Sequence, residues 1–248
     1  HGYQYKVKDI RIERPTGIEQ SKNFLYEIIS KQQADTLLEA YPNIIDKIIK
    51  NDLSDMDFNK TKGIKDATFS KIKHKVISNF ALIDIVDQFK GSISLAMANK
   101  LYNKYASIQK IKSALYENPY KALCDISRIG FKTADSIILS IESSDCFKFK
   151  TANMITSKDR MRACLEFILE ENESSGNTKI DAVQLRKNCF KLTPECISAF
   201  MEVLKENNDK IYIDNVDKTI SRTVAHDTEV YIANVLKELN NRQDAWNV

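Results

Sequence analysis

The feature that most constrains the fold is a weak internal repeat of four segments within the first 150 residues. Each segment has an apolar turn residue, a second small or apolar residue five positions later, and a third three positions beyond that. These residues are Ile29, Ile64, Ile93 and Ile129, then Ala34, Phe69, Ala98 and Ala134, then Leu37, Ile72, Leu101 and Ile137. The turn residues lie 29 to 36 positions apart. A repeat of this period predicts stacked helical units that share one core.

The fourth copy, DISRIGFKTAD at residues 125–135, is the sharpest. Ile129 in a tight turn is followed by Gly130 and by a helix that opens with Lys132 and Thr133. This is the local chemistry of a helix-hairpin-helix motif, which presents backbone N–H groups to a phosphate oxygen without reading sequence. A glycine lets the backbone approach the phosphate, and a lysine or hydroxyl in the first turn adds a further contact.

We therefore expect two of the four hairpins to contact nucleic acid. The stronger candidate is the fourth, with Arg128, Ile129, Gly130, Phe131, Lys132 and Thr133. The second has a glycine before its apolar residue and lies within a lysine run, which gives Lys62, Gly63, Lys65, Lys71, Lys73 and Lys75. The first and third hairpins have no glycine directly beside the apolar residue, and we expect them to be structural copies. For each hairpin the alternative is a helix turn packed inside the protein.

Charge supports a nucleic-acid partner for the repeat region. Residues 1–150 carry 24 Lys and Arg against 18 Asp and Glu, whereas residues 151–248 carry 13 against 16. A solvated helix face is the alternative explanation for the lysine run. Its coincidence with a hairpin favours nucleic-acid binding.

The repeat region is expected to be helical. The chain has only 6 Gly and 4 Pro in 248 residues, and apolar residues recur at three and four positions from residue 18 to about 142. This pattern predicts helices of roughly 8–14 residues, with breaks near Tyr41-Pro42, Gly63, Gly91 and Asn118-Pro119. Residues 3–13 alternate apolar and charged side chains, which predicts a strand that ends a preceding small β domain.

The C-terminal part predicts helices and a hairpin. After a linker at 143–153, a helix begins at Ser157, with a buried stripe of Met161, Cys164, Leu165, Ile168 and Leu169. A second helix covers 181–188. Thr193-Pro194-Glu195 predicts a capped third helix, with Ile197, Phe200, Met201 and Leu204 buried. Alternation at 210–214 and 219–224 predicts a two-stranded wing. A last helix, 227–239, is expected to bury Tyr231, Ile232, Val235, Leu236 and Leu239.

The expected fold class is mainly α, with tandem helix-hairpin-helix repeats followed by a winged-helix-like α+β domain. The expected domains are a terminal strand at 1–16, the hairpin repeats at 17–145, the winged-helix-like domain at 146–225 and a final helix at 226–248.

The motifs argue against an enzyme. The cysteines at 124, 146, 164, 189 and 196 form no C-x-x-C pair, which predicts buried free thiols rather than a metal site. His74 is expected at the surface, and Asp52, Asp55 and Asp57 as a polar loop, with metal binding as the alternative. No G-x-x-x-x-G-K-[ST] motif occurs. No apolar run is long enough to span a bilayer, and we expect a cytoplasmic protein with no membrane partner.

The stretch from Glu117 to Leu123, IGFKTAD at 129–135 and the following Arg160-Met161-Arg162-Ala163 resemble the N-terminal region of the RecD-like, TraA-type bacterial DNA helicases. The family pattern there is close to ENPY-x-L…DI-x-GIGFKTAD. The resemblance covers essentially the whole chain, although only 117–135 is specific. Arg128 stands where the family has glycine. The first hairpin, usually glycine-rich in the family, has lost both glycines.

The resemblance implies a non-catalytic, sequence-independent DNA-binding accessory region of an ATP-dependent 5′-to-3′ DNA helicase in repair or recombination. The final helix would lead toward motor domains absent from this chain. No cofactor is expected here, and ATP and Mg²⁺ would belong to the motor. The implied partners are single-stranded or forked DNA, the motor domains in cis and a single-strand-binding protein. The alternative is a degenerate hairpin scaffold that docks the motor or the single-strand-binding protein.

Overall fold

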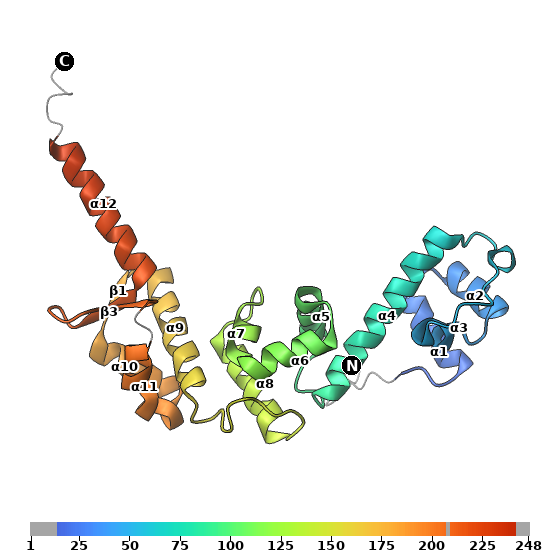
Figure 1. Cartoon of the computed structure of the whole chain (residues 1–248), viewed down its shortest axis with the longest axis horizontal. Coiled ribbons are helices and arrows are strands. Elements are labelled where there is room, and N and C mark those ends of the chain that lie inside the picture. Colours follow the sequence, from blue (N-terminus) through green and yellow to red (C-terminus); the bar gives the residue numbers. More distant parts are fainter. Residues whose placement is uncertain (1–13, 207–208, 242–248) are drawn as a thin grey trace, which may run out of the picture. The chain divides into compact units, whose positions relative to one another are not determined.

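The computed structural model describes residues 14–206 and 209–241 (Figure 1). Contacts within the chain divide it into two compact units, 1–111 and 112–248, which are described separately. The strand predicted at 3–13 lies outside the described residues. The domain boundaries expected from the sequence stay a prediction.

The first unit is helical. Its elements are α1 (Ile18–Ile28), α2 (Lys31–Ala40), α3 (Ile44–Lys50), the 3₁₀ helix η1 (Phe58–Lys60), α4 (Asp66–Gln88) and α5 (Leu95–Tyr105), and α6 (Ile108–Glu117) begins here. Tyr41 ends α2, and Gly63 and Gly91 adopt positive φ angles of 81° and 76°, which confirms these predicted breaks.

Helix α4 has 23 residues and is longer than the sequence predicts. No glycine or proline interrupts it, and buried residues continue along one face at Phe69, Ile72, Val76, Phe80 and Ile83. It therefore serves as the second helix of the second hairpin and as the first helix of the third.

The first two hairpins share one hydrophobic core. Their turn residues Ile29 and Ile64 are buried in it together with Ala34 and Leu37. The large Phe69 replaces the small residue of the other copies and packs edge-on against Phe58, with ring centroids 5.6 Å apart. The predicted shared core is thus confirmed for the first two copies of the repeat.

The second unit combines helices with a small sheet. Its elements are α7 (Pro119–Cys124), α8 (Phe131–Ser143), α9 (Lys158–Ser174), β1 (Lys179–Asp181), α10 (Ala182–Leu192), the 3₁₀ helix η2 (Pro194–Ala199), α11 (Phe200–Glu206), β2 (Ile211–Asp214), β3 (Thr219–Arg222) and α12 (Thr223–Asn241). Asn118 caps α7 and Pro119 opens it, which confirms the last predicted break.

The three strands form an antiparallel sheet in the order β1-β3-β2. Ile220 of β3 lies opposite both Ile180 of β1 and Ile213 of β2. The expected mainly α fold with a β wing is confirmed, although the sequence did not predict β1. The order α9-β1-α10-α11-β2-β3 supports the winged-helix interpretation, which stays a prediction.

Several predicted details of the second unit are wrong. The predicted linker at 143–153 does join α8 to α9, but it is packed against the fold, because Phe149 is buried and the N–H of Lys150 donates to the Tyr116 carbonyl at 3.0 Å. The predicted helix after Thr193 begins as a 3₁₀ helix, and the Thr193 hydroxyl donates to the Cys189 carbonyl instead of capping it. Met201 is 58% exposed, and Val203 is buried in its place.

Helix α12 does not bury the residues expected of it. Tyr231 is 69% exposed, and Ile232, Leu236 and Leu239 are each at least half exposed. The helix is anchored near its start, where the ring of His226 stacks on Tyr212 of β2 at 3.5 Å. The apolar periodicity is present, but most of α12 extends beyond the strands (Figure 1).

Candidate nucleic-acid interface

The four hairpins share one local geometry. In each, the apolar turn residue is buried and the next residue is the N-cap of a helix. These N-caps are Ser30, Lys65, Ser94 and Gly130, all in extended conformation. In the fourth copy Ile137 is only half-buried and Ile138 fills the core, so the repeat shifts by one residue there.

The hairpins differ in how these helices are capped. The hydroxyl oxygen of Ser30 accepts from the N–H of Gln33, and that of Ser94 accepts from the N–H of Met97, each at 3.3 Å. Neither Lys65 nor Gly130 makes such a side-chain cap. We call the first and third the serine-capped hairpins and the second and fourth the open hairpins. The first-turn N–H groups of α4 and α8 can therefore serve an external acceptor.

The fourth hairpin combines a buried anchor with an exposed polar surface. Ile129 and Phe131 are buried, and the ring of Phe131 packs against Tyr120 and Phe167 with centroids 5.9 and 5.8 Å away. These two residues hold the turn, so they can offer only backbone groups to a ligand. The exposed residues of the turn are Arg128, Gly130, Lys132 and Thr133.

Arg128 has a φ of 66°, the left-handed region that favours glycine. This is the position at which the resemblance to the RecD-like helicases implies glycine. The backbone turn is thus retained with a cation at its surface. Within the described residues Arg128 forms no ion pair.

Gly130 has an ordinary φ of −88°. A Cβ built on it would meet only the Phe167 ring, at 3.9 Å, which is normal van der Waals contact. The fold therefore does not require glycine at this position. Its missing side chain instead leaves the N-terminus of α8 open toward solvent.

Lys132 leans toward α9. Its Nζ lies 3.9 Å from Oε1 of Glu171 and 5.2 Å from the centre of the Phe167 ring, while its side chain stays 63% exposed. Such an exposed pair is weak. The ammonium group can therefore turn to a phosphate at small cost.

The lysine run of the second hairpin divides into two groups. Lys62, Lys65 and Lys71 are exposed and make no ion pair within the described residues. Lys73 donates to the Asn51 side-chain oxygen at 2.6 Å, and Lys75 donates to the Ile28 carbonyl at the end of α1 at 3.0 Å. The second group stabilises helix ends, and the first is left for an anion.

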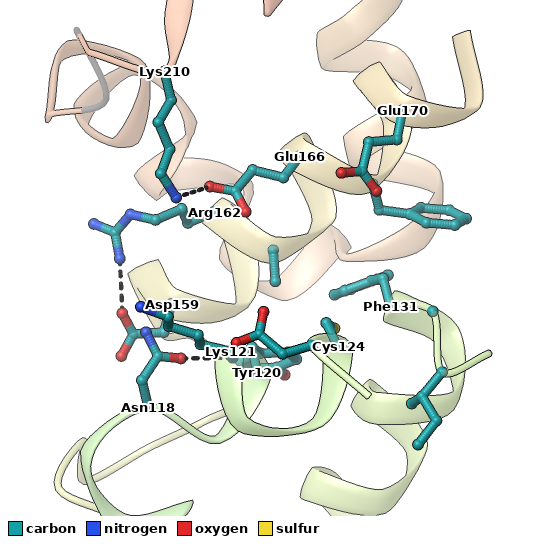
Figure 2. A pocket seen from close by; sticks show the side chains of 15 residues that line it. Asn118, Tyr120, Lys121, Cys124, Phe131, Asp159, Arg162, Glu166, Glu170 and Lys210 are labelled. Atoms are coloured by element: carbon teal, nitrogen blue, oxygen red, sulfur yellow. Dashed lines mark hydrogen bonds and ion pairs between the residues drawn. The ribbon is translucent and has the colours of Figure 1, made fainter. Parts of the chain in front are cut away.

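A pocket of about 250 Å³ lies beside the fourth hairpin (Figure 2). Arg162 and Lys210 line it, but they pair with Asp159 at 2.8 Å and Glu166 at 3.0 Å. Asp125 and Glu170 also contribute to its wall. These carboxylates disfavour a phosphate inside the pocket.

Cys124 lines the same pocket. Burial raises the pKa of its thiol to about 11, so it stays protonated at neutral pH. All five cysteines are free, but Cys124 and Cys146 are only partly buried, which corrects the expectation of five buried thiols.

A buried ion pair joins α8 to α9. The guanidinium of Arg160 donates to both oxygens of Asp135, at 2.8 and 2.9 Å, and also to Glu195. The hydroxyl of Tyr120 donates to Asp135 at 2.6 Å, and burial followed by this bond raises the Tyr120 pKa. This network fixes the first turns of α8, and sequence reasoning did not find it.

The acidic loop at 52–57 has a structural role. Asp55 accepts from Lys47 at 2.8 Å, and Asp57 caps η1. Across the part of the chain that the structure describes, no group of His, Cys, Asp or Glu is arranged to hold a metal ion. No described helix has the length and apolarity to cross a membrane. His74 is exposed, as predicted.

Comparison with protein families decides the identity of this region. A family model described as the helix-hairpin-helix domain of the ATP-dependent RecD2 DNA helicases matches residues 82–179. Residues 82–179 are similar to a RecD2-type helix-hairpin-helix domain. Comparison with curated proteins and with solved structures gives no match.

The matched residues include the turns of the third and fourth hairpins and all of α9. They contain the stretch 117–135 on which the resemblance rests, and the resemblance to a RecD-like helicase is confirmed there. Asp135 closes that stretch and binds Arg160 of the following segment. Two parts of the family pattern are thus joined by one buried pair.

Proposed function

We propose that this region grips the sugar-phosphate backbone of DNA, without reading sequence, as a non-catalytic accessory part of an ATP-dependent 5′-to-3′ helicase in repair and recombination. The observation that carries the proposal is the open N-terminus of α8 at Gly130, beside the exposed Arg128, Lys132 and Thr133. The RecD2 family match includes this hairpin and supports the helicase context.

The chemistry follows from the exposed groups. A phosphate oxygen would accept from the first-turn N–H groups of α8, where the helix dipole is positive. Lys132 and Arg128 would supply charge, and the Thr133 hydroxyl would donate a further bond. All of these contacts are to phosphate and none requires a base edge, so binding would be independent of sequence.

The second hairpin would add a weaker contact. Gly63 provides the left-handed turn, and Lys62, Lys65 and Lys71 provide unpaired charge. The sequence has no phosphate-binding loop of the Walker type. We therefore assign ATP and Mg²⁺ to the motor domains of the helicase, which would be partners in cis.

The test is fluorescence anisotropy with labelled single-stranded, duplex and forked DNA at several salt concentrations. We expect micromolar binding that weakens steeply with salt. Replacing Arg128 and Lys132 together by alanine should lower the log–log salt slope by roughly 0.7–0.9 for each lost contact. Unchanged affinity and slope in this double variant would contradict the proposed site.

A second candidate function is a hairpin scaffold that docks the helicase motor or a single-strand-binding protein. The serine-capped hairpins favour it, because Ser30 and Ser94 already occupy first-turn donors. The same titration separates the two functions. Such a scaffold should show little DNA binding even at low salt.

A further inference from the structure

A groove of about 720 Å³ lies between α10, α11 and the β2–β3 hairpin. Its apolar lining includes Val183, Phe190, Met201, Leu204, Ile213 and Ile220. Val183 and Phe190 lie on the face of α10 opposite the buried Leu185 and Cys189. Helix α10 is therefore apolar on two faces, one inside the core and one in the groove.

The groove exposes large apolar side chains. Val183 is 76% exposed, Met201 58% and Phe190 54%. Apolar residues gathered in one concave site differ from the scattered apolar residues of an ordinary surface, and such sites mark binding surfaces. The exposure of Met201, which sequence periodicity placed in the core, is part of this feature.

The rim of the groove is positively charged. Arg186, Lys187 and Lys205 line it, and no carboxylate does. Among residues 14–206 and 209–241, none of these three cations forms an ion pair. The positive rim is local, because residues 151–248 carry 13 Lys and Arg against 16 Asp and Glu.

The carboxylates near the groove already accept hydrogen bonds or form ion pairs with other groups of the fold. Asp181 accepts from the N–H groups of Val183 and Gln184 and so caps α10. Asp214 accepts from two N–H groups in the β2–β3 turn. Glu206 pairs with Lys158 and Arg162 of α9. The fold therefore leaves the rim cations for an external anion.

We propose that this groove binds an acidic amphipathic peptide segment of a partner protein. Apolar side chains of the peptide would fill the groove, and its flanking Asp and Glu side chains would pair with the rim. The apolar floor gives a sugar-phosphate backbone little to bind.

The site is separate from the proposed DNA grip. No residue that lines the groove belongs to the turn of any of the four helix-hairpin-helix copies. The proposal therefore does not depend on DNA binding, and the two ligands can be titrated independently.

The probe is a fluorescein-labelled synthetic helix-forming peptide of about 15 residues, with Leu and Phe at helical spacing and Glu at the flanking positions. A second peptide replaces each Glu by Lys and keeps the apolar residues. We expect the full 248-residue chain to bind the acidic peptide at least about ten-fold more tightly than the basic one, measured by fluorescence anisotropy.

Two pairs of variants localise the binding. Phe190→Asp should weaken the acidic peptide by about ten-fold or more, whereas Val216→Asp should not. Val216 is 90% exposed in the β2–β3 turn and does not line the groove. Lys187→Glu should weaken binding several-fold, whereas Lys191→Glu, on the same helix outside the groove, should leave it unchanged. Circular dichroism checks that each variant is folded.

Three results would overturn the proposal. One is equal affinity for the acidic and basic peptides. Another is unchanged peptide affinity in folded Phe190→Asp. The third is a loss of DNA affinity in Phe190→Asp and Lys187→Glu without any peptide binding by the unaltered protein, which would assign the groove to nucleic acid.

Discussion

The serine-capped and open hairpins differ chiefly at one position, the residue that begins the second helix. Ser30 and Ser94 bond to first-turn N–H groups, whereas Lys65 and Gly130 do not. All four hairpins nevertheless bury their turn residue in the same way. A hydrophobic repeat therefore preserves the shape of the hairpin, and the cap residue determines whether its helix end is available to a ligand.

The fourth hairpin differs from the second in a further respect. Asp135 and Arg160 tie its helix to α9 through a buried bidentate pair, whereas the second hairpin rests on the aromatic contact of Phe69 with Phe58. Fixed donors lose less entropy on binding than mobile ones. Under the proposed function, we therefore expect the fourth hairpin to be the better phosphate site of the two.

The largest expected effect tests this anchor. Asp135→Ala would leave the guanidinium of Arg160, whose side chain is 6% exposed, without its main partner. We expect a loss of about 3 kcal/mol in the free energy of unfolding, measured with urea. Asp159→Ala is the control, because its partner Arg162 keeps Glu206. A loss for Asp135→Ala no larger than that of the control would show that the pair does not hold the hairpin.

The next effect tests the serine-capped hairpins. Ser30→Ala and Ser94→Ala each remove a cap, and each should lower the free energy of unfolding by about 1 kcal/mol. DNA affinity should stay unchanged, because the alanine methyl group would still cover the helix end whose N–H group the variant frees. A fall in DNA affinity without a change in stability would mean that these serines contact DNA.

The smallest effect concerns the surface around Lys132. Glu171→Gln removes the carboxylate that competes for Lys132, and should strengthen DNA binding by about two-fold at low salt. Glu166→Gln is the control, since Glu166 pairs with Lys210 instead. Equal strengthening of DNA binding by both variants would show that the loss of a negative charge, and not the release of Lys132, is the cause.

The sequence predicts much of this structure where local chemistry decides it. The four turn residues, the helix breaks at Gly63 and Gly91 and the buried stripe of α9 are confirmed, because each depends on short-range spacing or backbone conformation. The expectation that the first and third hairpins are structural copies is supported by their serine caps.

The missed features depend on contacts between distant residues. Asp135 and Arg160 are 25 positions apart, and no periodic pattern relates them. Met201 and Tyr231 were expected in the core because they lie on apolar helix faces. Periodicity identifies such a face, but it does not say whether another element covers it.

The most direct test of the central claim compares Gly130→Ala with Ser94→Ala in DNA titrations across salt concentrations. A Cβ at Gly130 fits the fold without a clash, so both variants should be folded. We predict that Gly130→Ala lowers DNA affinity by about ten-fold, because its methyl group obstructs the open helix end, and that Ser94→Ala leaves affinity unchanged. Equal affinities for Gly130→Ala and the unaltered protein would contradict the account.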